Sequence, residues 1–189
     1  APADAGAASR ELRELHLQQP GTEEQREKAS GYQGFYFGCI RGAQTATTDK
    51  YDCLGKPKQA WDQYVAGIQA LMVELPSTLY CASVAEEPVA AGAVPAAPPY
   101  FVSATLNFAA VDAGEFDKYS FNDGTPRQPV LFALTLLPCT RVLPLFAMDA
   151  YRAWEYEILI DAGQRVSEHG AWEDARGRKV LMLTVGGRA

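Results

Sequence analysis

Two glutamates two residues apart are the feature of this sequence best suited to chemistry. They lie in the segment WEYEILIDAG, residues 154–163, as Glu155 and Glu157. Side chains at positions i and i+2 of an extended chain project from the same face, so a strand here would place the two carboxylates side by side. Because like charges repel when they leave water, such a pair is typical of a site for a cationic or electron-poor partner. The alternative is a solvated face of an edge strand.

The composition limits the kinds of partner that the protein can take. The chain has 189 residues, 48% of them hydrophobic and 21% charged, which suits one globular domain with a sizeable core. A formal net charge of -6 argues against sequence-independent binding to nucleic acid or to an anionic membrane, because both need an excess of lysine and arginine. The longest apolar stretches have about ten residues, half of the ~20 that span a bilayer. We therefore expect a soluble protein that binds neither nucleic acid nor membrane.

The cysteines and histidines do not form a metal-binding pattern. The chain contains four scattered cysteines, Cys39, Cys53, Cys81 and Cys139. No two of them have CxxC spacing, and neither His16 nor His169 has a partner at ligand spacing, so we expect no metal site. In an oxidising compartment the first two cysteines could bridge a short loop. The last two lie in apolar, strand-like runs and are expected as buried thiols.

The first part of the sequence predicts helices and ordered loops. Residues 1–30 are polar and helix-prone, broken at QQPG and resumed at Thr22, where Gln25 stands at capping-box spacing. Glycines and aromatic residues dominate residues 31–58 and indicate ordered loops with one short strand. We expect a peripheral helical arm followed by these loops.

The remainder predicts one amphipathic helix and then a run of strands. Residues 58–75 carry apolar side chains at i, i+3, i+4 and i+7, which indicates a helix that Pro76 ends. Strands are expected in the segments STLYCASV, YFVSAT, VLFALTL, TRVLPLF, WEYEILI, QRVSEHGAW and KVLMLTV, with one short helix in LNFAAVDAGEF. Helices first and strands later indicate an α+β fold, divided into residues 1–57 and a main domain of residues 58–189.

Three blocks of the sequence, taken in order, resemble a known family. The first is a helix that runs into a Leu-Pro break and a strand, IQALMVELPSTLYCASV, and the second is an aromatic strand with a Ser-x-Thr motif, YFVSATLNFAAVDAGEF. The third is the ExE strand with a glycine turn and a final hairpin, EYEILIDAGQRV and KVLML. Together they resemble the mono-ADP-ribosyltransferases, which include arginine-specific vertebrate ecto-enzymes and bacterial toxins. The resemblance implies two packed, mainly antiparallel sheets around a cleft for NAD.

The resemblance also implies roles for individual residues, with NAD as substrate. Glu157 would hydrogen-bond the ribose 2′-hydroxyl and stabilise the oxocarbenium-like cation that forms when the nicotinamide–ribose bond breaks. Glu155 would hold the guanidinium of an acceptor arginine. Ser103 would orient Glu157. The further NAD contacts that the resemblance implies are Thr105, Arg41, Tyr80 and Phe101.

One position departs from the family pattern. Active members carry an arginine on the strand after the Leu-Pro break, where it grips the NAD phosphates, and Cys81 stands at that position here. A thiol offers one weak donor and no positive charge, so it cannot replace a guanidinium. Arg41 in FYFGCIRGA, at the end of an expected short aromatic strand, is a rival assignment. By order along the chain, Cys81 matches the position of the family arginine better than Arg41 does, although the Arg41 side chain could still reach the cleft.

Three functions remain open from the sequence. An active enzyme would transfer ADP-ribose from NAD to an exposed arginine of an acceptor protein. A degenerate member would use the fold as a binding or structural module, with residues 1–30 as surface for a protein partner. A glycohydrolase would pass ADP-ribose to water. We favour the transferase because both glutamates and both hydroxyls are present, and a guanidinium beside Glu157 would support it. The arginines considered for that position are Arg41, Arg127, Arg141 and Arg152.

Overall fold

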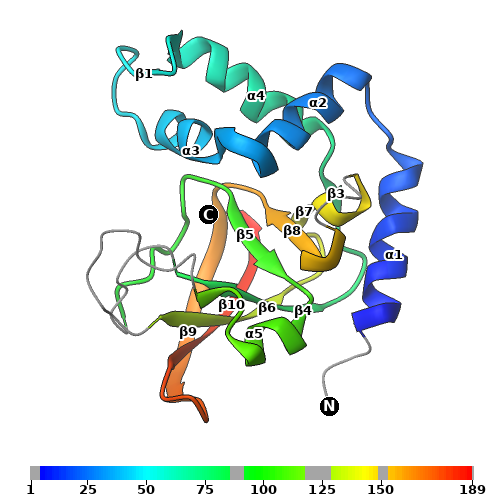
Figure 1. The fold of residues 1–189 in the computed structure, drawn as a ribbon, viewed down its shortest axis with the longest axis vertical. Coiled ribbons are helices and arrows are strands. Elements are labelled where there is room, and N and C mark those ends of the chain that lie inside the picture. The colour runs from blue at the N-terminus through cyan, green and yellow to red at the C-terminus, as the bar shows by residue number, and fades with distance from the viewer. Residues whose placement is uncertain (1–4, 86–91, 118–128, 149–152, 189) are drawn as a thin grey trace.

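Helices form the first part of the chain. The structure is a computed structural model that describes residues 5–85, 92–117, 129–148 and 153–188. Its first helices are α1 (Ala5–Gln18), α2 (Glu23–Gly31), the π-helix η1 (Tyr32–Tyr36), α3 (Phe37–Thr45) and α4 (Lys58–Ala70). A small hairpin of β1 (Asp52–Cys53) and β2 (Lys56–Pro57) separates α3 from α4. In Figure 1, α2, α3 and α4 form a layer above β5 and β8, and α1 runs down one side.

The main sheet follows the helices in sequence. Its strands are β3 (Val73–Glu74), β4 (Leu79–Val84), β5 (Val102–Thr105), β6 (Val130–Leu136), β7 (Arg141–Pro144), β8 (Glu157–Ile160), β9 (Gln164–Glu173) and β10 (Lys179–Arg188). Their order across the sheet is β3-β7-β8-β5-β4-β6-β10-β9. Among these described strands, β6 and β10 pair in parallel and the other neighbours pair antiparallel. Short helices stand between strands: α5 (Phe108–Ala113), η3 (Leu145–Ala147) and η4 (Ala153–Glu155).

The sheet divides into two halves between β4 and β5. These strands pair at one position, Ala82 with Thr105, whereas β4 pairs with β6 along its whole length from Leu79 to Val84. Beside that single pair, the Ser83 hydroxyl donates a hydrogen bond to the Ser103 carbonyl at 2.6 Å. The expected two sheets are thus two halves of one hydrogen-bonded sheet. The halves are joined at the pair Ala82–Thr105, and β4 and β5 do not pair beyond it. The prediction of an α+β fold with mainly antiparallel strands is confirmed.

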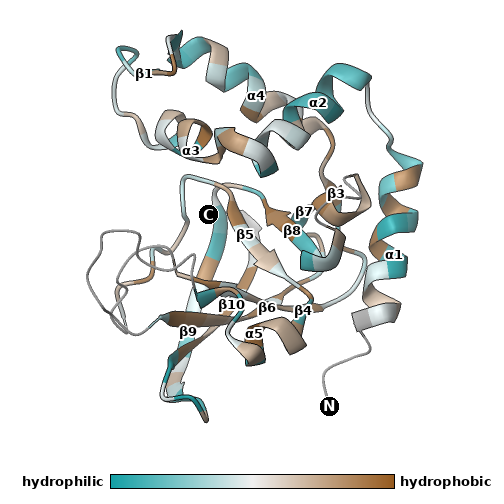
Figure 2. Cartoon of the chain, in the orientation of Figure 1, coloured by the Kyte–Doolittle hydropathy of each residue, from teal (hydrophilic) through white to brown (hydrophobic). Residues whose placement is uncertain are grey.

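Three clusters of buried hydrophobic residues hold the described part of the molecule together, and the smallest of them packs α5 against β4, β6 and β10. The two larger clusters position the site. One lies on the sheet and includes Leu136, Ile158 and Leu181, with Leu12 of α1 packed against it. The other lies in the helical layer. Its buried residues include Ile40, Trp61 and Ile68 from the helices, and Leu143 and Leu159 from the sheet. Figure 2 shows the polar residues of α1 and α2 on the outside of this arrangement. Residues from both 1–57 and 58–189 contribute to this helical core.

The amino-terminal helices agree with the sequence pattern. Thr22 caps α2 through a reciprocal pair of hydrogen bonds with Gln25, at 3.2 and 2.8 Å, as the capping-box spacing predicts. The arm is not peripheral, because Leu12 of α1 is 2% exposed against the sheet core. Among the described residues, no helix combines the length and the apolar character needed to cross a membrane.

Two elements predicted in the helical part of the chain were wrong in type or extent. The segment after α2 is helical from Tyr32 to Thr45, and the expected short aromatic strand before Arg41 does not form. Helix α4 ends at Ala70 rather than at Pro76, because the following residues extend to pair with β7 as β3. Sheet pairing there outweighs the helical periodicity, and the residue before a proline is itself disfavoured in a helix.

The cysteines divide into a disulfide and two free thiols. Cys39 of α3 and Cys53 of β1 form a disulfide, as the sequence allowed. Cys81 is buried as expected, whereas Cys139 is exposed, contrary to prediction. Cys139 has a φ of 67° and lies in the tight turn between β6, which ends at Leu136, and β7, so it is not part of the buried strand.

Candidate active site

A cavity of about 590 Å³ lies between the two halves of the sheet and below the helical layer. Apolar side chains from β4, β5, β6 and β10 form much of its wall. Its polar and charged lining consists of Gln33, Arg41, Ser83, Ser103, Thr105, Glu155, Glu157, Asp161 and Gln164. A volume of this size, mostly apolar with a few convergent polar groups, is typical of a small-molecule site. Among the described residues, no group of three or more potential ligands could hold a metal ion.

Glu157 lines the cavity with both of its carboxylate oxygens hydrogen-bonded. It opens β8, where it pairs with Thr105 of β5. The Ser103 hydroxyl donates to Glu157 Oε1 at 2.6 Å, and the Gln33 amide donates to Oε2 at 2.9 Å. The two carboxylate oxygens are thus bound by donors from two different layers of the protein. Hydrogen bonds of this kind fix the side chain and favour its ionised form.

Glu155 lines the same cavity but does not lie on the strand, so the expected alternation along one strand was wrong. It ends the short helix η4 and is 8% exposed. Tyr156 between the two acids has a φ of 44°, a left-handed conformation that is costly for a residue with a side chain. This turn, rather than the i, i+2 spacing, brings both carboxylates to one cavity.

The backbone of the Glu155 turn is held from β5 and the residues after it. The Thr105 hydroxyl donates to the Glu155 carbonyl and accepts from the Asn107 amide N–H at 2.9 Å. The Asn107 side chain donates to the Trp154 carbonyl at 2.8 Å. Thr105, expected as an NAD contact, therefore lines the cavity and also supports the turn that carries Glu155.

Arg41 brings a positive charge to the cavity from α3. Among the described lining residues it is the one lysine or arginine. Its guanidinium lies over the Tyr100 ring, 4.1 Å from the ring centroid. Burial raises the pKa of the neighbouring Tyr32 phenol, the charge of Glu157 adds to that rise, and the charge of Arg41 opposes it. Both charged groups therefore act on the same part of the cavity.

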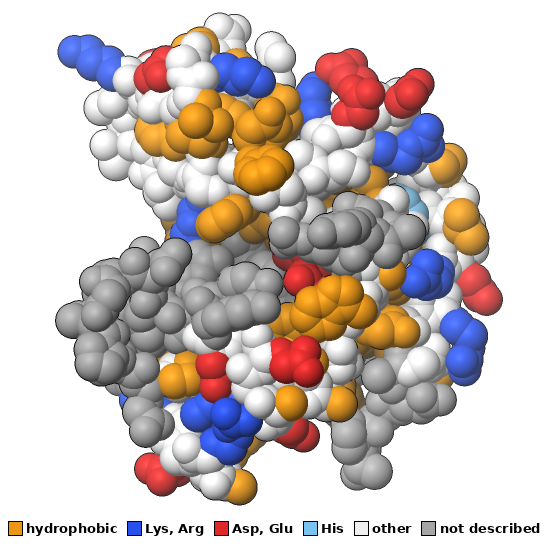
Figure 3. All heavy atoms as spheres, in the orientation of Figure 1, with side chains coloured by type: hydrophobic (Ala, Val, Ile, Leu, Met, Phe, Trp, Pro, Cys, Tyr) orange, Lys and Arg blue, Asp and Glu red, His pale blue; other side chains and the backbone are white. Residues whose placement is uncertain are grey.

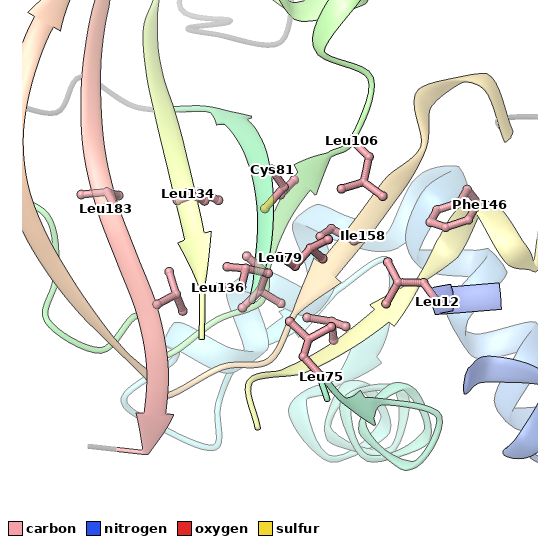
Figure 4. Close-up of a cluster of buried hydrophobic side chains, with 14 of the residues drawn as sticks. Leu12, Leu75, Leu79, Cys81, Leu106, Leu134, Leu136, Phe146, Ile158 and Leu183 are labelled. Carbon is pink, nitrogen blue, oxygen red and sulfur yellow. The ribbon is translucent and has the colours of Figure 1, made fainter. Parts of the chain in front are cut away.

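Cys81 lies outside the cavity lining, in the hydrophobic core. Figure 4 shows its side chain on β4 among leucines, including Leu79 and Leu134. It is 2% exposed, and burial raises the pKa of its thiol, so the group stays neutral. Cys81, which the sequence resemblance aligned with an arginine, is thus a core side chain.

Of the other two residues expected to contact NAD, Phe101 lines the cavity and Tyr80 does not. Phe101 is 4% exposed, lines the cavity and donates its backbone N–H to Gln44 at 3.2 Å. Tyr80 does not line the cavity; it is 51% exposed and borders a separate hollow of about 190 Å³ beside α1. Arg127 and Arg152 lie outside the described residues.

Arg141 supports the cavity from outside. Its guanidinium donates to Asp161 at 2.6 Å and to the Gln69 carbonyl at 2.6 Å, while the Gln69 amide donates to Asp161 at 2.8 Å. This network joins the end of α4 to β7 and to the end of β8. It fixes the helical layer, which carries Gln33 and Arg41, above the strand that carries Glu157.

Exposed aromatic side chains lie next in sequence or close in sequence to residues that line the cavity. Figure 3 shows hydrophobic side chains gathered over the helical layer, and a further group beside acidic side chains below it. The exposed fractions are 88% for Phe35, 51% for Phe37 and 45% for Trp154. Phe37 also lines the cavity. Large exposed apolar groups are typical of a binding surface.

Comparisons with family models and with curated proteins gave no match. Solved structures do match. Plx2a, an ADP-ribosyltransferase toxin from Paenibacillus larvae, has a TM-score of 0.70 at 11% identity, over 98% of each chain. The Vis toxin, an ADP-ribosyltransferase from Vibrio splendidus, has a TM-score of 0.64 at 11% identity, over 99% of this chain and 88% of that one. An ADP-ribosyltransferase from Clostridium botulinum has a TM-score of 0.65 at 9% identity, over 96% of each chain.

These structures share an architecture with this protein across nearly its whole length, at identities too low to carry over individual residues. The arrangement of the helical layer and the sheet is therefore that of a known fold. The protein has the ADP-ribosyltransferase fold.

Proposed function

We propose that the protein is an NAD-dependent mono-ADP-ribosyltransferase that modifies arginine side chains of an acceptor protein. The observation that carries the proposal is the Glu157 carboxylate, held by Ser103 and Gln33 at the wall of a cavity that Glu155 and Arg41 also line. A fixed carboxylate of this kind can stabilise a cation that develops on the anomeric carbon of a sugar.

In this reaction the bond between the nicotinamide nitrogen and the ribose anomeric carbon breaks, and nicotinamide leaves with the bonding electrons. Glu157 accepts a hydrogen bond from the ribose 2′-hydroxyl and stabilises the positive charge on the ring. A guanidinium nitrogen of the acceptor then bonds to the anomeric carbon and loses one proton. Glu155 binds that guanidinium, and Arg41 binds the NAD phosphates, for which its planar set of five donors is suited.

Three solved structures with this fold support the choice of ligands. A protein from S. aureus was solved with NAD, with a TM-score of 0.63 at 9% identity. Exoenzyme S from Pseudomonas aeruginosa was solved with human 14-3-3 protein beta and carba-NAD, with a TM-score of 0.56 at 13% identity. Vis was also solved with agmatine, whose guanidinium group resembles that of arginine, at a TM-score of 0.64 and 9% identity. The exposed aromatic residues Phe35, Phe37 and Trp154 offer surface for an acceptor protein.

Nicotinamide release from NAD in the presence of agmatine tests this function. Glu157→Gln should lower the rate by about a hundredfold to a thousandfold, because it removes a charge that acts in the transition state. Glu173→Gln on exposed β9 makes the same chemical change outside the cavity and should not alter the rate. Glu155→Gln should suppress transfer to agmatine more than release of free ADP-ribose. Equal rates for Glu157→Gln and the wild type would exclude the proposed mechanism.

The alternative function is a degenerate member that serves as a binding or structural module. It is favoured by Cys81, a neutral core side chain where the family pattern has an arginine. Its partner surface would include residues 1–30. Calorimetry with NAD separates the two functions: binding in the micromolar range supports the enzyme, and heat indistinguishable from dilution supports the module. A glycohydrolase would release free ADP-ribose at the same rate with and without agmatine.

A further inference from the structure

Gln33 reaches Glu157 from a part of the chain 124 residues away in sequence. It lies on η1, the π-helix between α2 and α3, and is 6% exposed. A π-helical turn holds more residues than an α-helical turn, so it rotates the side chains that follow and often stands at a functional site. Here Tyr32 and Gln33 face the interior, while Phe35 in the same turn is 88% exposed.

The hydrogen bond to Glu157 determines the orientation of the Gln33 amide. The Nε2 group is a donor and faces Glu157 Oε2 at 2.9 Å, whereas the amide oxygen in that place would be repelled. In this orientation the Gln33 Oε1 atom is buried and has no hydrogen-bond partner among the described residues. Burying a polar atom without a partner costs free energy. This cost offsets part of the stabilisation that the bond to Glu157 gives the fold.

Gln33 and Ser103 act on the two oxygens of one carboxylate. Ser103 comes from the sheet and donates at 2.6 Å, and Gln33 comes from the helical layer. A carboxylate held at both oxygens cannot rotate about its last torsion without losing a donor. Its charge and its direction in the cavity are thus set jointly by the two layers.

We infer that Gln33 is a positioning residue for Glu157, which keeps the carboxylate ionised and aimed into the cavity. The inference rests on the proposed function for its consequence in catalysis, while the effect on Glu157 itself is measurable without turnover. The sequence motifs do not identify Gln33, because it belongs to the helical layer and is 124 residues away from Glu157 in sequence.

The test uses Gln33→Met, which keeps the length of the side chain and removes its donor, with Gln63→Met on exposed α4 as matched control. The Glu157 carboxyl is followed by carbon-detected NMR during a pH titration and assigned with Glu157→Gln. Loss of a hydrogen bond to a charged group should move its titration midpoint up by about one pH unit. Nicotinamide release near neutral pH should fall about tenfold, with its acidic limb displaced upwards. Gln63→Met should match the wild type in both measurements.

Gln33→Glu provides a second variant with almost unchanged shape. It places two carboxylates in contact, so the pair should share a proton and the upper midpoint should move further than in Gln33→Met. Urea unfolding of each variant checks that the fold is retained. A Glu157 midpoint that is the same in folded wild type, Gln33→Met and Gln33→Glu would overturn the inference. A wild type that releases no nicotinamide would contradict the proposed function, and the NMR titration would still decide the role of Gln33.

Discussion

Arg141 joins the helical layer to the sheet, and Arg141→Met should lower the free energy of unfolding by about 3 kcal/mol. The guanidinium bonds Asp161, whose side chain is 3% exposed, so the substitution leaves a buried carboxylate without its countercharge. Breaking a buried ion pair in this way costs about 3–5 kcal/mol. The Arg141 side chain is 22% exposed, so water can enter the space that its guanidinium leaves and solvate Asp161. We therefore expect a loss at the lower end of that range.

Urea and thermal unfolding followed by circular dichroism measure this loss. For a domain of this size each kcal/mol corresponds to about 2–4 °C, so the midpoint of thermal unfolding should fall by about 6–12 °C. Adding Asp161→Asn removes the buried charge but keeps an acceptor for Gln69, and should recover a large part of the loss. Lys28→Met is the control, because its partner Glu24 is 75% exposed and the change should cost less than about 1 kcal/mol. Equal losses for Arg141→Met and Lys28→Met would refute the reasoning.

Further predictions follow from the disulfide, a histidine and the free thiols. Replacing Cys39 and Cys53 by serine opens a loop of 14 residues and should lower the free energy of unfolding by about 3 kcal/mol in urea. Burial, and then the charge of a nearby arginine, lowers the pKa of His16 below its ordinary 6.5. Its neutral form is favoured in the folded state, so stability should be full above about pH 6.5 and fall as the pH drops below it, and His16→Leu should flatten that dependence. A thiol reagent followed by mass spectrometry should label exposed Cys139 in the native protein and label Cys81 after unfolding.

Each of these predictions has a result that contradicts it. A double serine variant that unfolds at the wild-type urea concentration under oxidising conditions would contradict the predicted loss of stability. The histidine account fails if His16→Leu and wild type lose stability equally between pH 7 and pH 5. The thiol account fails if the native protein takes up label at Cys81 as fast as at Cys139.

The sequence predicted those parts of the fold that local patterns determine. The reciprocal cap of Thr22 and Gln25 needs only neighbouring residues, and the apolar periodicity around Trp61 comes from burial of one helix face. Pairing partners are not local. The end of α4 at Ala70 depends on β7, more than sixty residues later in the chain, and no pattern within the helix records that competition.

The sequence allowed some residues of the candidate site to be named, but it did not predict how they are arranged. Ser103 and Glu157 could be named because they stand in short motifs. The shared cavity of Glu155 and Glu157 depends on the left-handed turn at Tyr156, which the ExE spacing does not specify. Gln33 was missed because its place follows from a π-helical turn within a segment expected as loop. A helical periodicity that fails by one residue is the signal that could have indicated it.

The central claim is that the cavity beside Glu157 binds NAD with the scissile bond at this carboxylate. A crystal structure with a hydrolysis-resistant NAD analogue tests it most directly. We predict that the ribose 2′-hydroxyl lies within hydrogen-bond distance of Glu157 and that the phosphates lie at Arg41. An analogue bound elsewhere, or bound in the cavity with its nicotinamide ribose away from Glu157, would contradict it.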